Sequence, residues 1–425
     1  MARSLTPRDC HALMNLLVKE ATGQDATIQA VDSSTFVSAG ELVLATGVDN
    51  VLNSLSLVLG RTFMAVRPYK AKLSLINALN TDMYTNRMRK ISFYSRESQA
   101  SGDFNTQLYT NLAAGYDNGE NGLNASELPN STKSMWVQNP AVPLEVNFAG
   151  SSTWEDSTTI YEYQLKNIFR SEDEFAQFVS GIMTEKGNDI ESQKEAFNRM
   201  TILNHIAGVY DLDAASANGR AINLTKAFND EFGTSYTSAQ LRSTYLKDFL
   251  AFFVATFKMQ SRYLTYRSAK YHWSPAKTVG GVSYKLLRHT PYDRQRVMLY
   301  EPLFTKAEAL VLPEIFRPDY LDIDTQYEGI DYWQNVNDPS AIDVVPAIPD
   351  TSTGVQTAGT EVELAYVVGM IYDADAIMID YQLDTAATTP MEARKHYRNM
   401  WWSFAKNAIN DFTENAIIFY MADPT

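Results

Sequence analysis

Cysteine is almost absent from this chain of 425 residues, because Cys10 is the only one. A single cysteine excludes intramolecular disulfides, zinc ribbons and redox pairs, and it fits synthesis in a reducing compartment. Long apolar runs are also missing. The two longest, 249–257 and 364–372, reach about half of the ~20 residues that a membrane span needs. At the N-terminus, the apolar segment 13–18 is too short for a secretory signal. These absences predict a soluble, unexported protein.

The usual signatures of catalysis are missing as well. The sequence has no glycine-rich phosphate loop and no G-x-S-x-G elbow, and no two of its five histidines stand four residues apart. Two acidic pairs, Asp322 with Asp324 and Asp373 with Asp375, could hold a metal ion, but neither continues into a calcium-loop pattern. A metal-assisted hydrolase that uses these four acids is therefore kept as an alternative. The main prediction is a non-enzymatic protein with no catalytic, cofactor-binding or metal residues.

Charge is both acidic and unevenly distributed. The net charge of −14 makes the chain as a whole a poor ligand for nucleic acid, although a local basic patch could still contact it. Residues 61–96 hold eight basic residues and one acid, whereas residues 97–160 hold eight acids and one base. Either these are two solvated faces, or the acidic segment of one copy meets the basic strip of another.

The middle of the chain contrasts an irregular stretch with a regular one. Residues 84–163 are polar, rich in Gly, Asn and Ser, and have too few regularly spaced apolar residues for a core of their own. Ser171 and Glu174 then fit a capping box, and apolar residues follow at helical spacing to Tyr210, interrupted near Gly187. This pattern predicts a protruding arm followed by one long helical region with a possible kink.

The other expected elements are shorter. Helices are predicted over 6–23 and 48–59 and from Thr305 to Pro313. A further helix is predicted to start at a cap formed by Thr237 and Gln240 and to continue through an apolar stripe to Phe253. Strands are predicted over 296–300, 343–345, 363–372 and 376–381. A Thr-Pro-Met-Glu cap at 389–392 favours a helix, but alternation of Met400, Trp402 and Phe404 favours a strand, and we predict the strand.

This order of parts resembles the major capsid proteins of tailed phages with the Hong Kong 97-type fold. The run from Tyr163 to Ser180 is similar to the junction of strand and spine helix in head proteins of small short-tailed phages. The runs Met400-Trp-Trp-Ser-Phe404 and Asn415-Ala-Ile-Ile-Phe-Tyr420 resemble the closing strand pair of that group. In the extended loop, the resemblance implies an outgoing strand with residues 89–94 and a return with residues 135–137 and 142–148.

The fold implied is α+β. It comprises an N-terminal arm with short helices (1–60), an entry to the peripheral domain (61–83), an extended β-hairpin loop (84–163), the peripheral domain with its spine helix (164–215), an axial α/β domain (216–390) and closing strands of the peripheral domain (391–425).

The function implied is self-assembly into the icosahedral head shell that encloses a phage genome. The resemblance implies pentamers and hexamers of this chain, a separate scaffolding protein, a portal, and packaged DNA inside the shell without sequence-specific binding. The protein would be made in the bacterial host cytoplasm, reside in the virion and involve no membrane. An encapsulin-like compartment and a tail or portal component remain alternatives. The candidate contacts between subunits are Arg87, Arg89, Lys90, Glu120, Glu127, Trp136, Glu145 and Trp154.

Overall fold

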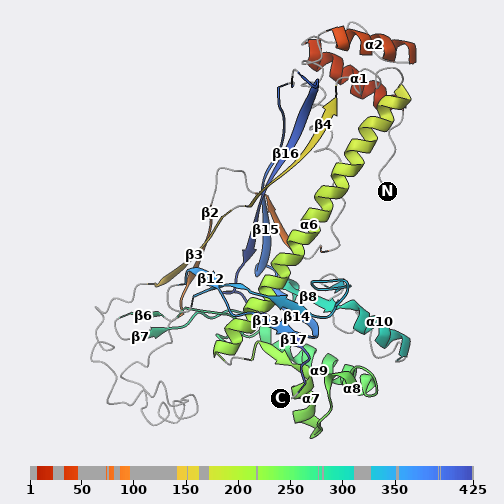
Figure 1. Ribbon diagram of the computed structural model, residues 1–425. Helices are drawn as coiled ribbons and strands as arrows, with labels where there is room; N and C mark the ends of the chain where they lie inside the picture. The colour runs from red at the N-terminus through yellow and green to blue at the C-terminus, as the bar shows by residue number, and fades with distance from the viewer. Residues whose placement is uncertain are drawn as a thin grey trace.

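The structure is a computed structural model. It describes residues 7–22, 33–45, 73, 76–80, 87–95, 141–150, 152–161, 172–216, 219–275, 277–279, 282–310, 327–350, 354–390, 392 and 394–423. Figure 1 shows a long helix with a narrow blade of strands beside it, short helices at one of its ends and a broader body at the other. Within the described residues, no helix is both long enough and apolar enough to cross a membrane.

Helix α6 is the axis of the molecule. It runs without interruption from Glu172 to Ser216, 45 residues, which corresponds to about 68 Å at ~1.5 Å per residue. The predicted long helical region is confirmed, and Gly187 lies inside the helix without breaking it. From Ile190 onward, side chains such as Phe197, Ile202 and Ile206 are buried, so the C-terminal half of α6 packs against both sheets.

The blade is a four-stranded sheet in the order β1 (Asn77–Asn80), β15 (Ile377–Thr388), β16 (Tyr397–Asn410) and β4 (Ser152–Tyr161). Along β16, Met400, Trp402 and Phe404 are buried and their neighbours are partly exposed, which is the alternation of a strand with one covered face. The predicted strand is therefore confirmed. β4 belongs to this sheet, so the described residues between 84 and 163 are divided between a hairpin (β2 and β3) and the blade.

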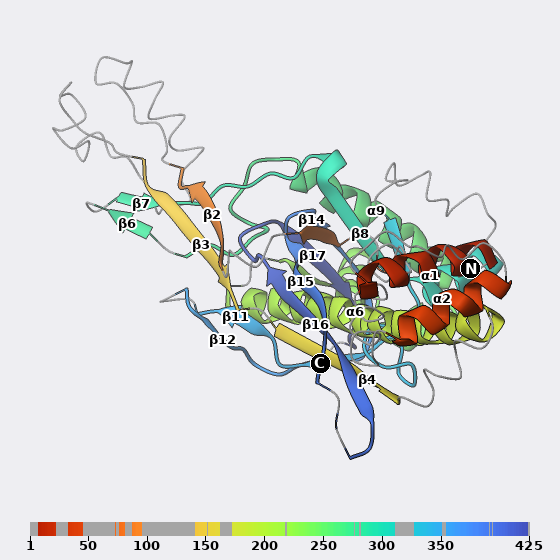
Figure 2. The same ribbon diagram turned by 90° about the horizontal axis from the view of Figure 1, so that it is seen from above.

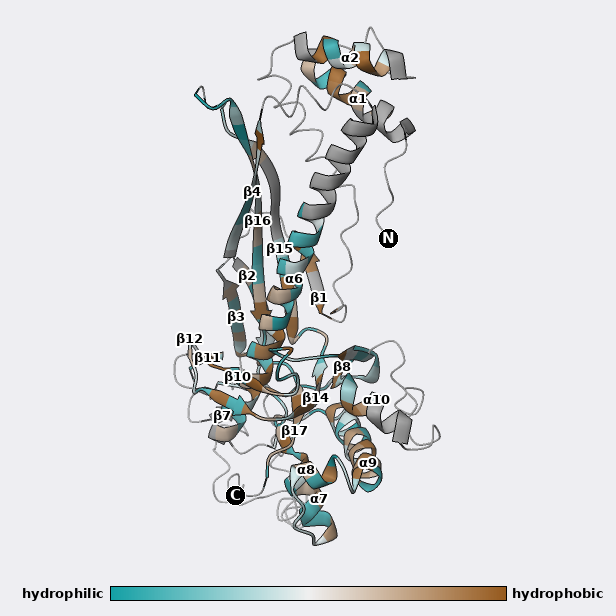
Figure 3. Ribbon diagram, turned by 45° about the vertical axis from the view of Figure 1, so that its right-hand side comes forward, coloured by the Kyte–Doolittle hydropathy of each residue, from teal (hydrophilic) through white to brown (hydrophobic). Residues whose placement is uncertain are grey.

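The body is built on a five-stranded sheet in the order β5 (Ala221–Asn223), β17 (Ala416–Tyr420), β14 (Val367–Asp373), β8 (Gln295–Tyr300) and β9 (Tyr327–Ile330). Every residue of β14 is buried, and Figure 3 shows the hydrophobic colour concentrated around β14 and β17. The two predicted C-terminal strands, β16 and β17, lie in different sheets. β16 ends in the blade and β17 crosses into the body, because its uniformly apolar sequence suits a strand that is covered on both faces.

Helix α9 (Leu246–Leu264) packs against this sheet, with Phe253 and Phe257 each 5.7 Å from the ring of Phe419. The capping box of Thr237 and Gln240 is confirmed, but its helix, α8 (Ser238–Leu241), ends after four residues. The expectation of one continuous helix is wrong there, because the chain turns at 242–245 before α9 begins. α7 (Leu224–Phe232) precedes this pair.

The remaining elements are shorter. α10 (Glu301–Leu310) begins four residues before its predicted cap. The predicted strands correspond to β8, β10 (Ile342–Val344), β13 (Val362–Leu364) with β14, and β15. A 3-10 turn, η2 (Tyr292–Arg294), precedes β8. β10 pairs with β13, β11 (Ala347–Pro349) with β12 (Gln356–Ala358), and β6 (Lys277–Val279) with β7 (Val282–Tyr284).

At the far end of α6, α1 (Pro7–Thr22) confirms the first predicted helix, and it packs with α2 (Ser33–Ala45) through buried Met14, Leu17 and Phe36. Sequence patterning missed α2. The helix predicted over 48–59 lies outside the described residues.

Gly369 is a test of close packing between β14 and β8. A Cβ at this position would lie 2.4 Å from the backbone oxygen of Met298 and 3.1 Å from the Cα of Leu299. Because these backbone atoms cannot move without distorting the pairing of β14 with β8, we expect Gly369→Ala to lower the free energy of unfolding by about 3 kcal/mol. Urea unfolding of the unassembled subunit measures this free energy.

Gly187→Ala is the control. Nothing lies within 4 Å of a Cβ built at this position, so the substitution should stabilise α6 by up to ~1 kcal/mol. Equal effects at both sites would contradict the packing argument.

Candidate assembly surface

A two-stranded hairpin runs from the blade along the side of the body toward β6 and β7 (Figures 1 and 2). β2 (Arg87–Phe93) pairs antiparallel with β3 (Pro143–Ala149), from Arg87 opposite Ala149 to Phe93 opposite Pro143. This confirms the outgoing strand and the 142–148 part of the return; residues 135–137 lie outside the described residues. Gly150, with a φ of +105°, separates β3 from β4. That backbone angle favours glycine, so the hairpin leaves the blade at a residue suited to a sharp change of direction.

One face of the hairpin is exposed. Side chains alternate between the two faces of a strand, and on β2 the outward positions are Arg89, Ile91 and Phe93, of which Ile91 is 51% and Phe93 61% exposed. On β3 their cross-strand neighbours Glu145 and Pro143 are also exposed. We call Arg89, Ile91, Phe93, Pro143, Glu145 and Asn147 the outer face. It carries large apolar groups that no described residue of the same chain covers.

The opposite face is tied to the body by charge. Lys90 Nζ bonds to the carboxylates of Asp411 and Glu414, and the Asp411 side chain is only 1% exposed. Arg288 lies 3.4 Å from Glu414 and donates hydrogen bonds to Ser92 Oγ at 2.7 Å and to the Thr413 carbonyl at 3.1 Å. Burial raises the pKa of Glu414, and the two cations oppose this effect. Two cations and two acids thus fix the inner face of the hairpin to the body; we call these contacts, with the cluster described next, the anchor.

A small apolar cluster completes this anchor. Tyr94 and Val142, at the end of the hairpin beyond Phe93 and Pro143, pack with Tyr284 and Leu286 of the body. The Tyr94 hydroxyl donates to the Pro275 carbonyl at 3.2 Å, and burial raises its pKa. The described part of the hairpin is therefore anchored on its own subunit by one face only.

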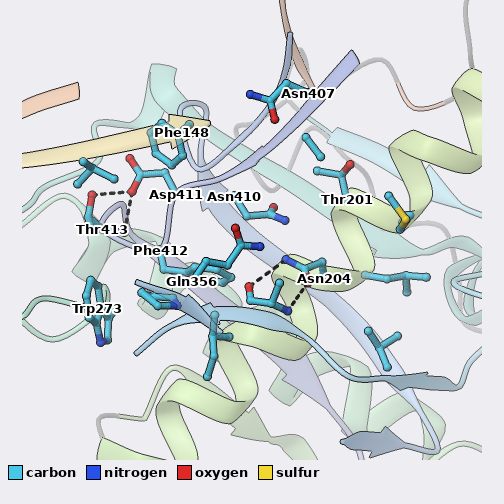
Figure 4. Close-up of a pocket in the computed structure, with 18 of the residues that line it drawn as sticks. Phe148, Thr201, Asn204, Trp273, Gln356, Asn407, Asn410, Asp411, Phe412 and Thr413 are labelled. Atoms are coloured by element: carbon cyan, nitrogen blue, oxygen red, sulfur yellow. Dashed lines mark hydrogen bonds between the residues drawn. The ribbon is translucent and has the colours of Figure 1, made fainter. Parts of the chain in front are cut away.

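Behind β3 lies an open cleft of about 1210 Å³. Figure 4 shows Phe148 of β3, Asn204 of α6, Trp273 and the turn from Asp411 to Thr413 around it. Asn204 accepts a hydrogen bond from the Ala347 amide at 2.7 Å and so holds β11 at its margin. Half-buried side chains of β3 line this cleft. The hairpin is fixed to the body mainly by the anchor contacts of Lys90, Arg288 and Tyr94.

The predicted contact residues fall into three groups. Arg87, Arg89, Lys90 and Glu145 share the hairpin: Arg89 lies 3.4 Å from Glu145 on the outer face, while Lys90 is turned to the anchor. Trp154 lies apart, on β4, 41% exposed and edge-on to Phe197 at 6.4 Å. Glu120, Glu127 and Trp136 lie outside the described residues. Sequence reasoning missed Ile91 and Phe93, although their alternation with Ser92 and Tyr94 was the available signal.

The acids of the hydrolase alternative do not form a metal site where they are described. Asp373 accepts from Thr290 Oγ1 at 2.9 Å and Arg294 at 3.2 Å, and Asp375 also pairs with Arg294. The guanidinium of Arg294 therefore already pairs with both carboxylates. Asp322 and Asp324 lie outside the described residues. A separate group, Asp343, Glu361 and Glu363, is fully exposed, as acidic groups commonly are.

One protein-family model matches this chain, and solved structures share its fold. A protein-family model described as Phi29-like phage major capsid protein matches residues 155–420, more than half of the chain. No curated protein matches. A chain in the structure of head fiber and inner core protein gp22 of native bacteriophage P68 is similar, with a TM-score of 0.50 and 10% identity over 84% of this chain and 86% of that one. A chain in the capsid structure of Staphylococcus phage Andhra gives a TM-score of 0.49 and 10% identity over 81% and 83%.

Proposed function

The chain belongs to the family of Phi29-like phage major capsid proteins, and we propose that its copies join into the head shell through the outer face of the β2–β3 hairpin. The family match makes it a structural protein of the virion capsid and favours the head shell over an encapsulin-like compartment or a hydrolase. The contact through the hairpin is the step beyond that role.

The observation that supports this contact is the exposure of Ile91 and Phe93 on a hairpin whose other face is anchored. Exposed hydrophobic patches commonly mark protein interaction sites. A two-stranded hairpin is marginal alone, and its open edges invite pairing with another chain. A neighbouring copy would cover the apolar groups and could pair with an edge. The anchor would set the angle at which the hairpin reaches that neighbour.

The shell would be made of pentamers and hexamers, so one surface must serve in two settings. A separate scaffolding protein and a portal would take part, as the sequence resemblance implies, with packaged DNA inside. The hairpin suits this variation because its outer face is exposed and because it leaves the blade at Gly150, a position suited to a change of direction.

The double substitution Ile91→Ser with Phe93→Ser tests the proposal. We expect the subunit to fold, since neither side chain packs in the anchor. Loss of two half-exposed apolar side chains would cost each contact about 2 kcal/mol, which raises the protein concentration needed for assembly at least tenfold. Light scattering and electron microscopy over a concentration series measure this.

The matched control is Val336→Ser with Met259→Ser, which removes two equally exposed apolar side chains elsewhere on the body. It should assemble at nearly the wild-type concentration. Wild-type assembly by the hairpin variant would show that the outer face is not the contact.

A further inference from the structure

Besides residues 61–96, a second basic segment in this acidic chain lies between Asp248 and Asp293. That interval contains no acid and seven basic residues: Lys258, Arg262, Arg267, Lys270, Lys277, Lys285 and Arg288. Five tyrosines and two histidines are interspersed with them. In a chain with a net charge of −14, a run of 44 residues without an acid stands out against the average composition.

Folding brings two parts of this interval together. Ser268 and Arg288 exchange backbone hydrogen bonds of 2.9 Å, and the amide of Thr290 donates to the carbonyl of Leu264 at 2.7 Å. The end of α9 and the segment 265–270 therefore lie beside 285–290. The amide of Ser95 donates to the carbonyl of Lys285 at 2.9 Å, which places these segments beside the end of the described hairpin that is farthest from Gly150. Figures 1 and 2 both show β6 and β7 beside β3.

We call the exposed side chains of these two adjacent segments the basic tyrosine surface. Its members are Arg262, Tyr263, Tyr266, Arg267, Lys270 and Lys285. Tyr263 is 42% and Tyr266 58% exposed. Neighbouring Arg288 and Arg294 are paired with Glu414 and with Asp373 and Asp375. By contrast, no carboxylate in the described part of the chain pairs with Arg262, Lys270 or Lys285.

We propose that the basic tyrosine surface binds the phosphate backbone of double-stranded DNA without reading its sequence. Lysine and arginine on phosphates release condensed counterions, and this supplies essentially all of nonspecific affinity. Tyrosine hydroxyls also donate hydrogen bonds to phosphate oxygens. The inference uses the head-shell role only to name the source of the polyanion, and it is independent of the hairpin contact.

An acidic segment of a second copy is the competing ligand. Residues 97–140 carry five acids and one base. That charge is sparse compared with duplex DNA, which presents one negative charge per ~1.7 Å of its axis. Three unpaired cations beside two exposed phenols are better matched to closely spaced phosphates, so the observations favour DNA.

The test is fluorescence anisotropy of a labelled 30-base-pair duplex of random sequence, with full-length subunits kept below their assembly concentration. The variant is Arg262→Gln, Lys270→Gln, Lys285→Gln; Arg267 is retained because it bonds to Ser95. Each lost phosphate contact reduces the slope of log affinity against log salt by ~0.9. Between 50 and 200 mM salt, the wild type should therefore lose about 40-fold more affinity than the variant.

The control is Lys247→Gln, Arg394→Gln, Lys395→Gln, which removes the same charge from other exposed positions. It should keep the wild-type slope. The proposal is overturned if the wild type does not bind the duplex at 50 mM salt, or if both triple variants behave alike. It is also overturned if a synthetic peptide of residues 97–140 binds this surface and the duplex does not.

The same samples separate this inference from the hairpin proposal. If the variant Arg262→Gln, Lys270→Gln, Lys285→Gln loses DNA binding but forms normal shells, the DNA-binding surface is distinct from the assembly contact. If the outer-face variant loses assembly but binds the duplex normally, the DNA site stands independently. If the wild type assembles normally and does not bind DNA, only the DNA site is refuted.

Discussion

Replacing residues 96–140 with an Asn-Gly pair is expected to give a subunit that folds and forms no shells. These residues connect the two strands of the hairpin and carry most of the polar segment that cannot build its own core. If neighbouring copies complete one another through this arm, its removal eliminates a contact that each subunit would donate. Electron microscopy and sedimentation of concentrated protein should show subunits or small oligomers only.

The structure gives the reason to expect folding. The amide of Tyr94 donates to the carbonyl of Val142 at 3.0 Å, so Ser95 and Ala141 follow as the next cross-strand pair. A two-residue Asn-Gly loop is the preferred connection for such a pair, because its twist matches that of the strands. The pairing of β2 with β3, the contacts of Lys90 and the cluster around Tyr94 all remain. Urea unfolding should stay cooperative.

Two measurements make this prediction sharp. A synthetic peptide of residues 96–140 should inhibit assembly of the wild type, and a scrambled peptide of the same composition should not. Shells of normal appearance from the shortened subunit would refute the proposed role of the arm. An unfolded product would instead refute the inference that one face of the hairpin is enough to anchor it.

Sequence patterns predicted the structure best where the residues of a single helix or strand are enough to determine it. Apolar spacing predicted α6, and alternation of Met400, Trp402 and Phe404 predicted β16 against a competing helix cap. Thr237 and Gln240 specified a helix start correctly, because a capping box depends on residues three apart. Its end at Leu241 was missed, since the next residues have no Gly or Pro to mark the turn.

Long-range partners could not be predicted in this way. Lys90 pairs with Asp411 and Glu414, which lie 321 and 324 residues later in the chain. The charge segregation pointed instead to acids of a neighbouring copy. In the structure, both Lys90 and Arg89 have acidic partners in their own subunit. Likewise, β17 follows β16 closely in sequence yet joins another sheet, because pairing is decided by which faces are buried.

Acid is expected to destabilise the subunit strongly through two buried histidines. Burial lowers the pKa of His205 and of His272 to about 4, from an ordinary value of 6.5. Nearby Asp411 raises the pKa of His205, Arg220 lowers it, and neither reverses the effect of burial. Between pH 6.5 and 4 the unfolded chain therefore binds more protons than the folded one, and stability falls as the pH falls.

The size of this effect is large for one residue. A pKa difference of about 2.5 units corresponds to about 3 kcal/mol per histidine, fully lost near pH 4. Two such groups together approach the total stability of an ordinary domain. Glu414 acts in the opposite direction, because its raised pKa makes its contribution more favourable at low pH. The histidines dominate, since both change charge inside the core.

His205→Phe isolates one of these contributions. The ring of His205 stacks on Phe412 with centroids 5.1 Å apart, and neither ring nitrogen has a hydrogen-bond partner among the described residues. A phenyl ring should preserve the stack and remove two buried polar atoms. We expect stability at pH 7 to stay equal or rise, and the loss between pH 7 and pH 4.5 to shrink by about 2 kcal/mol.

The measurement is urea unfolding at several pH values in the shortened subunit without residues 96–140, so that shell dissociation does not contribute. His289→Gln is the control, because His289 is an exposed histidine, and its pH profile should follow that of the parent. An unchanged pH profile for His205→Phe would show that His205 does not control acid stability. The prediction also links the core to the proposed assembly contact. His205 of α6 stacks on Phe412, and Phe412 lies between Asp411 and Glu414, the two acids that bind Lys90 of the hairpin. Protonation of His205 would therefore disturb the stack directly beside the residues that hold the hairpin.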